Sequence, residues 1–225
     1  MDLTTNFMSW IEPVFGRSAL FQQGIEVFFL SYVLGCISTG YYLVRLLRTK
    51  DIRDFGSGNI GARNVGRELG SAGFAFTLLV DAGKGALAVW IAKEFSPDTL
   101  LQIVAILAVV IGHNWPAQLR FRGGKGISTS IGALLVFDYR LLAFLLATAA
   151  VLWVFLRKKT LSGLLTVVLM PLIEGLWTKD SMQAFYLSAL ALIILWAHRG
   201  NITEEISHFH FRRSVHLKPD DTIKQ

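Results

Sequence analysis

The sequence predicts an all-α integral membrane protein with seven transmembrane helices, and two observations lead to that prediction. Of its 225 residues, 53% are apolar and only 17% are charged, and the mean hydropathy is +0.50. An ordinary soluble domain carries about 25% charged residues. The charged residues also cluster between long apolar runs. Together these features exclude a disordered chain and a typical soluble globule, and the single cysteine, Cys36, excludes a disulfide scaffold.

Seven apolar runs supply the expected spans. A helix needs about 20 mostly apolar residues to cross roughly 30 Å of hydrocarbon. The runs are Ile25–Val44, Phe74–Ile91, Leu100–Gly112, Ile127–Phe137, Leu141–Leu156, Leu161–Trp177 and Met182–Ala197. Ser96-Pro97-Asp98 is a helix-start signal before the third run. Several runs are shorter than a full span, and Ile127–Phe137 either crosses the membrane or is re-entrant or buried in protein.

The distribution of basic residues predicts the orientation, because Lys and Arg accumulate in cytoplasmic loops. With the N-terminus outside, 17 of the 22 Lys and Arg residues fall on the cytoplasmic side, 4 fall outside, and Lys84 lies within a span. We therefore expect an outer N-terminus, a cytoplasmic C-terminus and the glycine-rich loops on the cytoplasmic face. No cleavable signal peptide is expected, since the first residues lack a basic region.

Three parts of the chain differ in composition. Scattered Trp and Phe residues near the start predict an interfacial segment on the outer surface. The predicted parts are an N-terminal interfacial segment at 1–24, a seven-span membrane domain at 25–202 and a polar cytoplasmic tail at 203–225.

Three segments on the predicted inner side combine glycines with polar or basic residues. They are Phe55–Arg67, Gly112–Pro116 with Phe121–Gly126, and His198–Ile202. Glycines let backbone N–H groups converge on an anion, and Lys or Arg adds charge-assisted hydrogen bonds. With Arg67 and Lys125 beside the glycines, the pattern predicts one site for an anionic substrate with more than one charged group, which phosphate fits best. For the basic residues at 45–53 and 157–159 we favour the simpler explanation, that they only mark the cytoplasmic side.

Two phosphate-binding motifs are matched only superficially. Gly56, Gly58 and Gly61 fit G-x-G-x-x-G with Asp81 twenty residues on, but no strand precedes the glycines and Asp81 lies inside an apolar helix. The sequence around Lys125 has neither the hydroxyl residue after the lysine nor the earlier glycine of a P-loop. Neither a dinucleotide-binding fold nor a P-loop is therefore expected.

Asp81 and Lys84 form an i, i+3 pair within the second apolar run. Ionisable groups at that depth are rare and face protein or a cavity. The pair either supports the site from below or is an ion pair that fixes helix packing.

The histidines allow several roles. His113 and His198 are candidate bases or hydrogen-bond donors at the membrane boundary. A serine-hydrolase triad is possible on residue types alone, but Ser57 does not lie in a G-x-S-x-G elbow. The tail histidines have no carboxylate partner in the pattern, so no metal site is expected there; they are His208, His210 and His216.

The three segments, in this order and spacing, resemble the bacterial acyl-phosphate:glycerol-3-phosphate acyltransferases, the PlsY family. The resemblance runs from Tyr32 to Asn201. Its specific parts are Gly56–Ala62, Asn64-Val65, Asp81 with Lys84-Gly85, Gly112-His113, Phe121–Gly126, and His198-Arg199 with Asn201. Each short motif is weak alone, but three of them on a chain with seven apolar runs are specific.

The resemblance implies transfer of a fatty acyl group from acyl-phosphate to the sn-1 hydroxyl of glycerol 3-phosphate, giving lysophosphatidic acid and phosphate in the first step of phospholipid synthesis. It implies no cofactor, no metal and no nucleic acid, and a multi-pass monomer in the lipid bilayer of the bacterial cytoplasmic (inner) membrane. The catalytic residues that it implies are Ser57, Arg67, Lys125, His198 and Asn201. The phosphate- or substrate-binding residues are Gly56, Gly58, Asn59, Gly61, Asn64, His113, Gly123, Gly124 and Gly126, with Asp81 and Lys84 in support.

The match departs from the family pattern in two places. Arg63 replaces the usual threonine, and Glu204, His208 and His210 occupy positions where the family has Arg, Gly and Glu. A divergent or inactive member with another acceptor is therefore an alternative. A membrane transporter for a phosphorylated metabolite is another, although no paired half-repeats are found.

Overall fold

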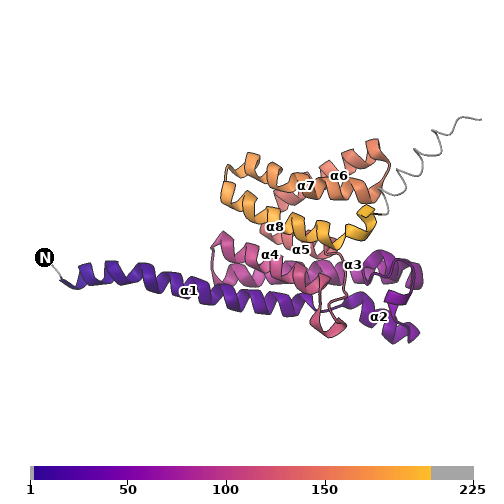
Figure 1. Ribbon diagram of the computed structural model, residues 1–225, viewed down its shortest axis with the longest axis horizontal. Coiled ribbons are helices and arrows are strands. Elements are labelled where there is room, and N and C mark those ends of the chain that lie inside the picture. Colours follow the sequence, from indigo (N-terminus) through magenta and orange to yellow (C-terminus); the bar gives the residue numbers. More distant parts are fainter. Residues whose placement is uncertain (1–2, 204–225) are drawn as a thin grey trace, which may run out of the picture.

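A computed structural model of the chain describes the backbone of residues 3–203 and side chains from residue 19 onward. Its described part consists of helices and loops without a strand (Figure 1), which confirms the all-α prediction for these residues. The helices are α1 (Leu3–Gly35), α2 (Thr39–Arg48), α3 (Ala62–Phe95), α4 (Thr99–Asn114), α5 (Ile127–Phe137), α6 (Tyr139–Leu156), α7 (Lys159–Thr178) and α8 (Ser181–Ala197). Short 3-10 helices lie at Ile52–Asp54 and Ala117–Leu119. The tail histidines and Glu204 lie outside the described residues.

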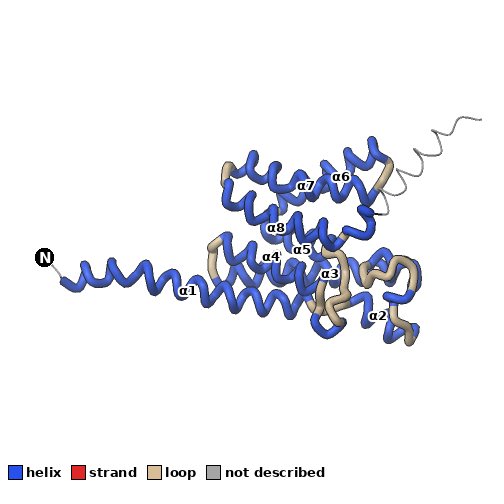
Figure 2. The backbone as a smooth tube through the Cα atoms, in the orientation of Figure 1, coloured by secondary structure: helices blue, strands red, loops and turns tan. Residues whose placement is uncertain are grey.

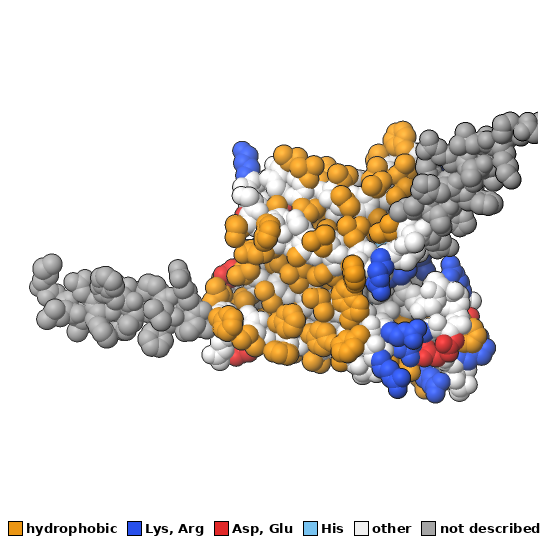
Figure 3. All heavy atoms as spheres, in the orientation of Figure 1, with side chains coloured by type: hydrophobic (Ala, Val, Ile, Leu, Met, Phe, Trp, Pro, Cys, Tyr) orange, Lys and Arg blue, Asp and Glu red, His pale blue; other side chains and the backbone are white. Residues whose placement is uncertain are grey.

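Five stretches of the described chain are long and apolar enough to cross a membrane. They are Ala19–Arg48, Ala62–Phe95, Thr99–Leu119, Tyr139–Leu156 and Lys159–Thr178. Ile127–Phe137 and Ser181–Ala197 are also apolar but shorter. Apolar side chains cover the middle of the visible face, and Lys and Arg gather toward the end near α2 (Figure 3).

The helices pack side by side along a common direction, so the connecting loops gather at two ends of the bundle (Figure 2). Contacts join α1 to α4, α3 to α4 and α5, and α6 and α8 to α7. Buried side chains from α3 to α8 form one main core, which includes Val89, Ile106, Leu134, Leu145, Met170 and Leu190. We call the end that carries residues 36–61, 115–126, 157–158 and 198–203 the loop end.

Glycines let pairs of helices touch through their backbones. A Cβ on Gly85 would overlap the carbonyl oxygen of Thr129, and one on Gly132 would overlap that of Ala82, so α3 and α5 cross in backbone contact. Gly35 of α1 meets Gly112 of α4 in the same way. Small residues at such crossings are typical of packed membrane helices.

The first predicted span, Ile25–Val44, is interrupted. Helix α1 ends at Gly35 and α2 begins at Thr39. The carbonyl oxygens freed by the break are bonded by side chains from other elements: Gln118 donates to Cys36, and Lys84 Nζ donates to the Ile37 oxygen at 2.7 Å. The break therefore depends on distant partners, which is why local hydropathy did not predict it.

The second predicted span begins earlier than its apolar run. Helix α3 starts at Ala62, twelve residues before Phe74, and bends at Gly70, whose backbone angles (φ 71°, ψ −166°) are non-helical. The second half of the first glycine-rich segment, including Asn64 and Arg67, is thus helical rather than a loop. By contrast, the predicted run Ile127–Phe137 coincides with α5 at both ends.

Candidate functional site

The three glycine-rich segments meet at a cavity of about 420 Å³ at the loop end. Ser57, Lys125 and Asn201, one from each segment, all line it. The predicted site residues that line the cavity are Ser57, Asn59, Gly61, Asn64, Arg67, Asp81, His113, Lys125, Gly126, His198 and Asn201. Residues separated by up to 144 positions in the chain therefore share one space.

The other predicted site residues shape the surroundings of the cavity without lining it. They are Gly56, Gly58, Gly123, Gly124 and Lys84. Gly56 and Gly58 have positive φ angles of 58° and 65°, a backbone conformation that favours glycine. Gly56 also leaves no room for a Cβ beside the Asn64 side chain.

Asn64 organises the first segment from within helix α3. Its side-chain oxygen accepts a hydrogen bond from the Ser57 N–H at 3.1 Å. Its Nδ2 donates to the carbonyl oxygens of Ile52, Phe55 and Asn59 at 2.9–3.2 Å. Because the side chain is only 2% exposed and its polar atoms are bonded to the loop, this geometry fixes the loop that presents Ser57.

The second segment folds back onto the end of α4. The Gly123 N–H donates to the Asn114 carbonyl at 3.0 Å, and the Gly124 N–H donates to the His113 carbonyl at 2.9 Å. A Cβ on Gly124 would overlap Nε2 of the His113 ring, so only glycine lets the loop lie flat on this ring. The loop therefore takes its shape from contact with His113 and delivers Lys125 to the cavity.

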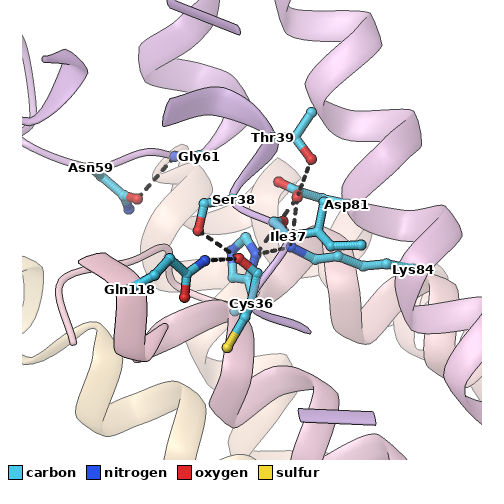
Figure 4. A network of polar contacts seen from close by, with 10 residues as sticks. Cys36, Ile37, Ser38, Thr39, Asn59, Gly61, Asp81, Lys84 and Gln118 are labelled. Carbon is cyan, nitrogen blue, oxygen red and sulfur yellow. Dashed lines mark hydrogen bonds and ion pairs between the residues drawn. The ribbon is translucent and has the colours of Figure 1, made fainter. Parts of the chain in front are cut away.

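A buried polar network lies beneath these loops (Figure 4). Lys84 Nζ lies 2.9 Å from Asp81 Oδ1 and 2.8 Å from His113 Nδ1, and Thr39 donates to the same Asp81 oxygen at 3.2 Å. All four side chains are at most 8% exposed. The network joins the α1–α2 break, by way of Ile37 and Thr39, to α3 and α4. Asp81 and His113 also line the cavity, so the network contacts both the packed helices and the candidate site.

His198 and Asn201 close the cavity from the end of α8. His198 Nδ1 lies 2.9 Å from the Ile194 carbonyl oxygen. A carbonyl can only accept, so Nδ1 carries the proton and Nε2 is an acceptor. Burial lowers the pKa of His198, and the charges of Lys125 and Arg63 lower it further, although the backbone hydrogen bond opposes the shift. Lys125 Nζ donates to the side-chain oxygen of Asn201, which links the second and third segments.

The electrostatics of the cavity favour anions. Four cationic side chains line it, from Arg63, Arg67, Lys125 and Lys159, whereas Asp81 is the one lining carboxylate among the described residues. Asp81 is moreover paired with Lys84. No three His, Cys, Asp or Glu side chains in the described part of the chain stand close enough together to hold a metal ion.

Three helices also begin at this cavity, each with unsatisfied backbone N–H groups and a positive dipole end. They are α3, α5 and α7, preceded by Gly61, Gly126 and Lys158, none of which caps its helix with a side-chain hydrogen bond. The helices α4, α6 and α8 begin at the opposite end, and each is capped by an aspartate, namely Asp98, Asp138 and Asp180. Helix N-termini bind phosphate readily, so the uncapped ends reinforce the preference for anions.

Part of the cavity lining is apolar, and we call this part the apolar wall. Its residues include Phe74 and Leu78 of α3, Ile131 of α5 and Leu164 of α7. A ligand that suits both parts carries a phosphate group and a hydrocarbon chain.

Sequence reasoning missed some of the lining residues. Arg63 stands beside Asn64 and Arg67, but the sequence only marked it as a departure from a family pattern. Lys159, Thr160 and Gly163 come from the first turns of α7. Lys159 was explained as one of the basic residues that mark the cytoplasmic side, and only the position of α7 against the cavity distinguishes it from its neighbours.

Comparison with known proteins gives consistent matches. A family model described as glycerol-3-phosphate acyltransferase matches residues 25–208. Glycerol-3-phosphate acyltransferase 1 of Desulfitobacterium hafniense (strain Y51) is 42% identical over 195 residues, which cover 84% of this chain and 95% of the relative. The protein of the same name from Bacillus cereus (strain ATCC 14579) is 39% identical over 169 residues, which cover 75% of this chain and 93% of the relative.

Solved structures agree with the sequence matches. The crystal structure of PlsY (YgiH), an integral membrane glycerol 3-phosphate acyltransferase, in its glycerol 3-phosphate form, superposes with a TM-score of 0.75 at 27% identity. The match covers 82% of this chain and 92% of that one. The lysophosphatidic acid form of the same enzyme gives a TM-score of 0.71.

Proposed function

Because this chain belongs to the glycerol-3-phosphate acyltransferase family, we propose that it transfers a fatty acyl group from acyl-phosphate to the sn-1 hydroxyl of glycerol 3-phosphate. The products are lysophosphatidic acid and inorganic phosphate. The observation that supports this most strongly is the cavity in which three distant segments bring cations, helix N-termini and an apolar wall together. No cofactor enters the reaction.

The proposed membrane arrangement has seven spans, formed by α1 and α3 to α8, with the N-terminus outside and the loop end in the cytoplasm. The concentration of Lys and Arg toward the loop end supports this orientation. In this orientation the cavity opens to the compartment that holds water-soluble glycerol 3-phosphate, and the apolar wall lies within the bilayer. The enzyme acts as a monomer in the bacterial cytoplasmic membrane.

The two substrates each carry a phosphate group, and the cavity offers two groups of donors. Arg67 lies on the first segment and Lys125 on the second, so each can neutralise one phosphate with charge-assisted hydrogen bonds. The uncapped N–H groups at the starts of α3, α5 and α7 add donors that need no reorganisation. Holding both phosphates brings a hydroxyl and a carbonyl together, which replaces a bimolecular encounter by a fixed geometry.

The hydrocarbon chain of the donor lies against the apolar wall formed by Phe74, Leu78, Ile131 and Leu164. Its acyl carbonyl is thereby held at the boundary between that wall and the polar rim. This placement explains why a site for a water-soluble acceptor is built at the end of a membrane bundle.

Acyl transfer requires little from the protein beyond alignment and charge stabilisation, because the acyl-phosphate is already activated. The glycerol hydroxyl oxygen forms a bond to the carbonyl carbon, the bond from that carbon to the phosphate oxygen breaks, and the hydroxyl proton passes to the departing phosphate. His198 Nε2 and Ser57 orient the hydroxyl. Asn201 has its oxygen engaged by Lys125, so its Nδ2 is left to donate to the carbonyl oxygen as negative charge develops there.

The test is an assay of the purified protein in sealed lipid vesicles with palmitoyl phosphate and glycerol 3-phosphate. Formation of lysophosphatidic acid together with an equal amount of phosphate supports the proposal. Binding of glycerol 3-phosphate without product would identify an inactive member of the fold. Movement of glycerol 3-phosphate across the vesicle wall without acylation would identify a transporter, and either result would contradict the proposed reaction.

A further inference from the structure

Two arginines stand one helical turn apart at the start of α3. Arg63 and Arg67 are i, i+4 neighbours, both are exposed, and both line the cavity. Neither forms a side-chain hydrogen bond or an ion pair with another residue of the described chain. Arg53 differs, since its guanidinium binds the Asp51 carboxylate and the Leu119 carbonyl oxygen. The α3 pair is therefore placed at the cavity without the acidic partners that hold a structural arginine.

This placement opposes the local electrostatics of the helix. Like charges at i, i+4 repel each other, and the positive end of the helix dipole disfavours cations in the first turns. No acidic residue occupies the first turn of α3 to offset the repulsion. Departures from local preference of this kind concentrate at functional sites, where a ligand supplies the missing partner.

Arg63 also acts across the cavity. Its charge and that of Lys125 both bear on His198, which lies at the end of α8. Arg63 is thus within electrostatic reach of the third segment while Arg67 lies close to Gly56 of the first. A phosphate group bound at the start of α3 would contact both guanidinium groups and the uncapped N–H groups of the helix.

We propose that Arg63 is a further phosphate-binding and specificity-determining residue, which forms with Arg67 a two-guanidinium site for the phosphate group of one of the two substrates. This inference rests on the proposed function. Planar guanidinium groups bind phosphate oxygens in bidentate fashion, and two of them match the double negative charge of a phosphate monoester. A phosphate bound there offsets the repulsion between the two guanidinium groups.

The experiment compares Arg63→Gln, which removes the charge but keeps a polar side chain, with Arg63→Lys and with a control, Arg48→Gln. Arg48 is an exposed cation at the loop end that does not line the cavity. Initial rates are measured while glycerol 3-phosphate and palmitoyl phosphate are varied in turn. We expect Arg63→Gln to raise KM for one of them about 10-fold or more, with kcat nearly unchanged, and Arg63→Lys to restore part of the loss. A rise for glycerol 3-phosphate assigns the site to the acceptor, and a rise for palmitoyl phosphate assigns it to the donor.

A second readout does not depend on turnover. Inorganic phosphate is expected to raise the Tm of the detergent-solubilised wild-type protein and to raise that of Arg63→Gln much less, whereas Arg48→Gln responds like the wild type. Unchanged KM values for both substrates, or a loss of kcat alone, would overturn the inference. If the wild type makes no product, the proposed function fails, and the phosphate-induced change in Tm still decides whether Arg63 binds phosphate.

Discussion

The Lys84 ammonium donates a hydrogen bond to Nδ1 of His113 across 2.8 Å, inside the helical bundle. The same ammonium contacts Asp81 at 2.9 Å and the Ile37 carbonyl at 2.7 Å, so its three N–H groups each have a partner. With Nδ1 accepting, His113 carries its proton on Nε2, the atom against which Gly124 packs. One buried cation thereby connects the α1–α2 break to the loop that presents Lys125.

Replacing Lys84 by methionine is expected to destabilise the protein strongly. The substitution leaves the Asp81 carboxylate buried without its cation, and breaking a buried pair in this way costs about 3–5 kcal/mol. Thermal unfolding in detergent measures the effect. The double variant Asp81→Asn with Lys84→Met removes both charges and should recover a large part of the lost stability. A double variant no more stable than Lys84→Met would show that the ion pair does not control packing.

Replacing Gly124 by alanine is expected to reduce activity while the bundle stays folded. The added methyl group meets the His113 ring, which Lys84 holds in place, so the loop must move and carry Lys125 with it. A displacement of about 1 Å in a positioned group lowers rates by roughly 100-fold. Gly83→Ala is the matched control, since a Cβ there has no neighbour within 4 Å. Equal activity of the two variants would contradict the role given to the loop.

Acid is expected to destabilise the folded protein partly through His198. Its pKa in the folded state lies below the ordinary 6.5, because burial and the nearby Lys125 and Arg63 charges disfavour protonation. Below pH 6.5 the unfolded chain therefore binds this proton before the folded one, and the free energy of unfolding falls as pH decreases. Well above pH 6.5 both states are neutral at this residue, and the contribution no longer varies.

The measurement is the loss of Tm between pH 7.5 and pH 5.0 for the wild type and for His198→Gln. Glutamine cannot take up the proton, so the variant should lose less Tm than the wild type. The effects of other acid-sensitive groups are common to both proteins and cancel in the comparison. A variant that loses as much Tm as the wild type would show that His198 does not titrate in this range.

Hydropathy and spacing predicted much of the fold because apolar runs are local properties of the chain. The bounds of α5 and the helix start at Asp98 follow from the sequence alone. The break at Cys36–Ser38 and the early start of α3 do not. The break is satisfied by Gln118 and Lys84 from elsewhere in the chain, and the first turns of α3 are too polar to resemble a membrane span.

The candidate site shows the same division. Residue types and glycines indicated which segments gather, and Ser57, Lys125 and Asn201 do share one cavity. The different roles of residues within one segment follow only from the three-dimensional structure. Asn64 and Ser57 are seven residues apart, but the Asn64 side chain is enclosed by the loop, whereas Ser57 is exposed. Lys159 could not be distinguished in sequence from its basic neighbours Arg157 and Lys158, and Arg63 differed from other basic residues only as a departure from the family pattern.

The central claim is that the cavity between the three segments is the site of acyl transfer from acyl-phosphate. The rate of lysophosphatidic acid formation by the Lys125→Ala variant tests this claim most directly. Losing one charged hydrogen bond costs about 1.5–3 kcal/mol, so we expect the rate to fall by roughly 10- to 150-fold, with Tm close to that of the wild type. Arg48→Ala, which removes an exposed cation at the same end outside the cavity, should leave the rate unchanged. A Lys125→Ala protein that forms product as fast as the wild type would contradict the account.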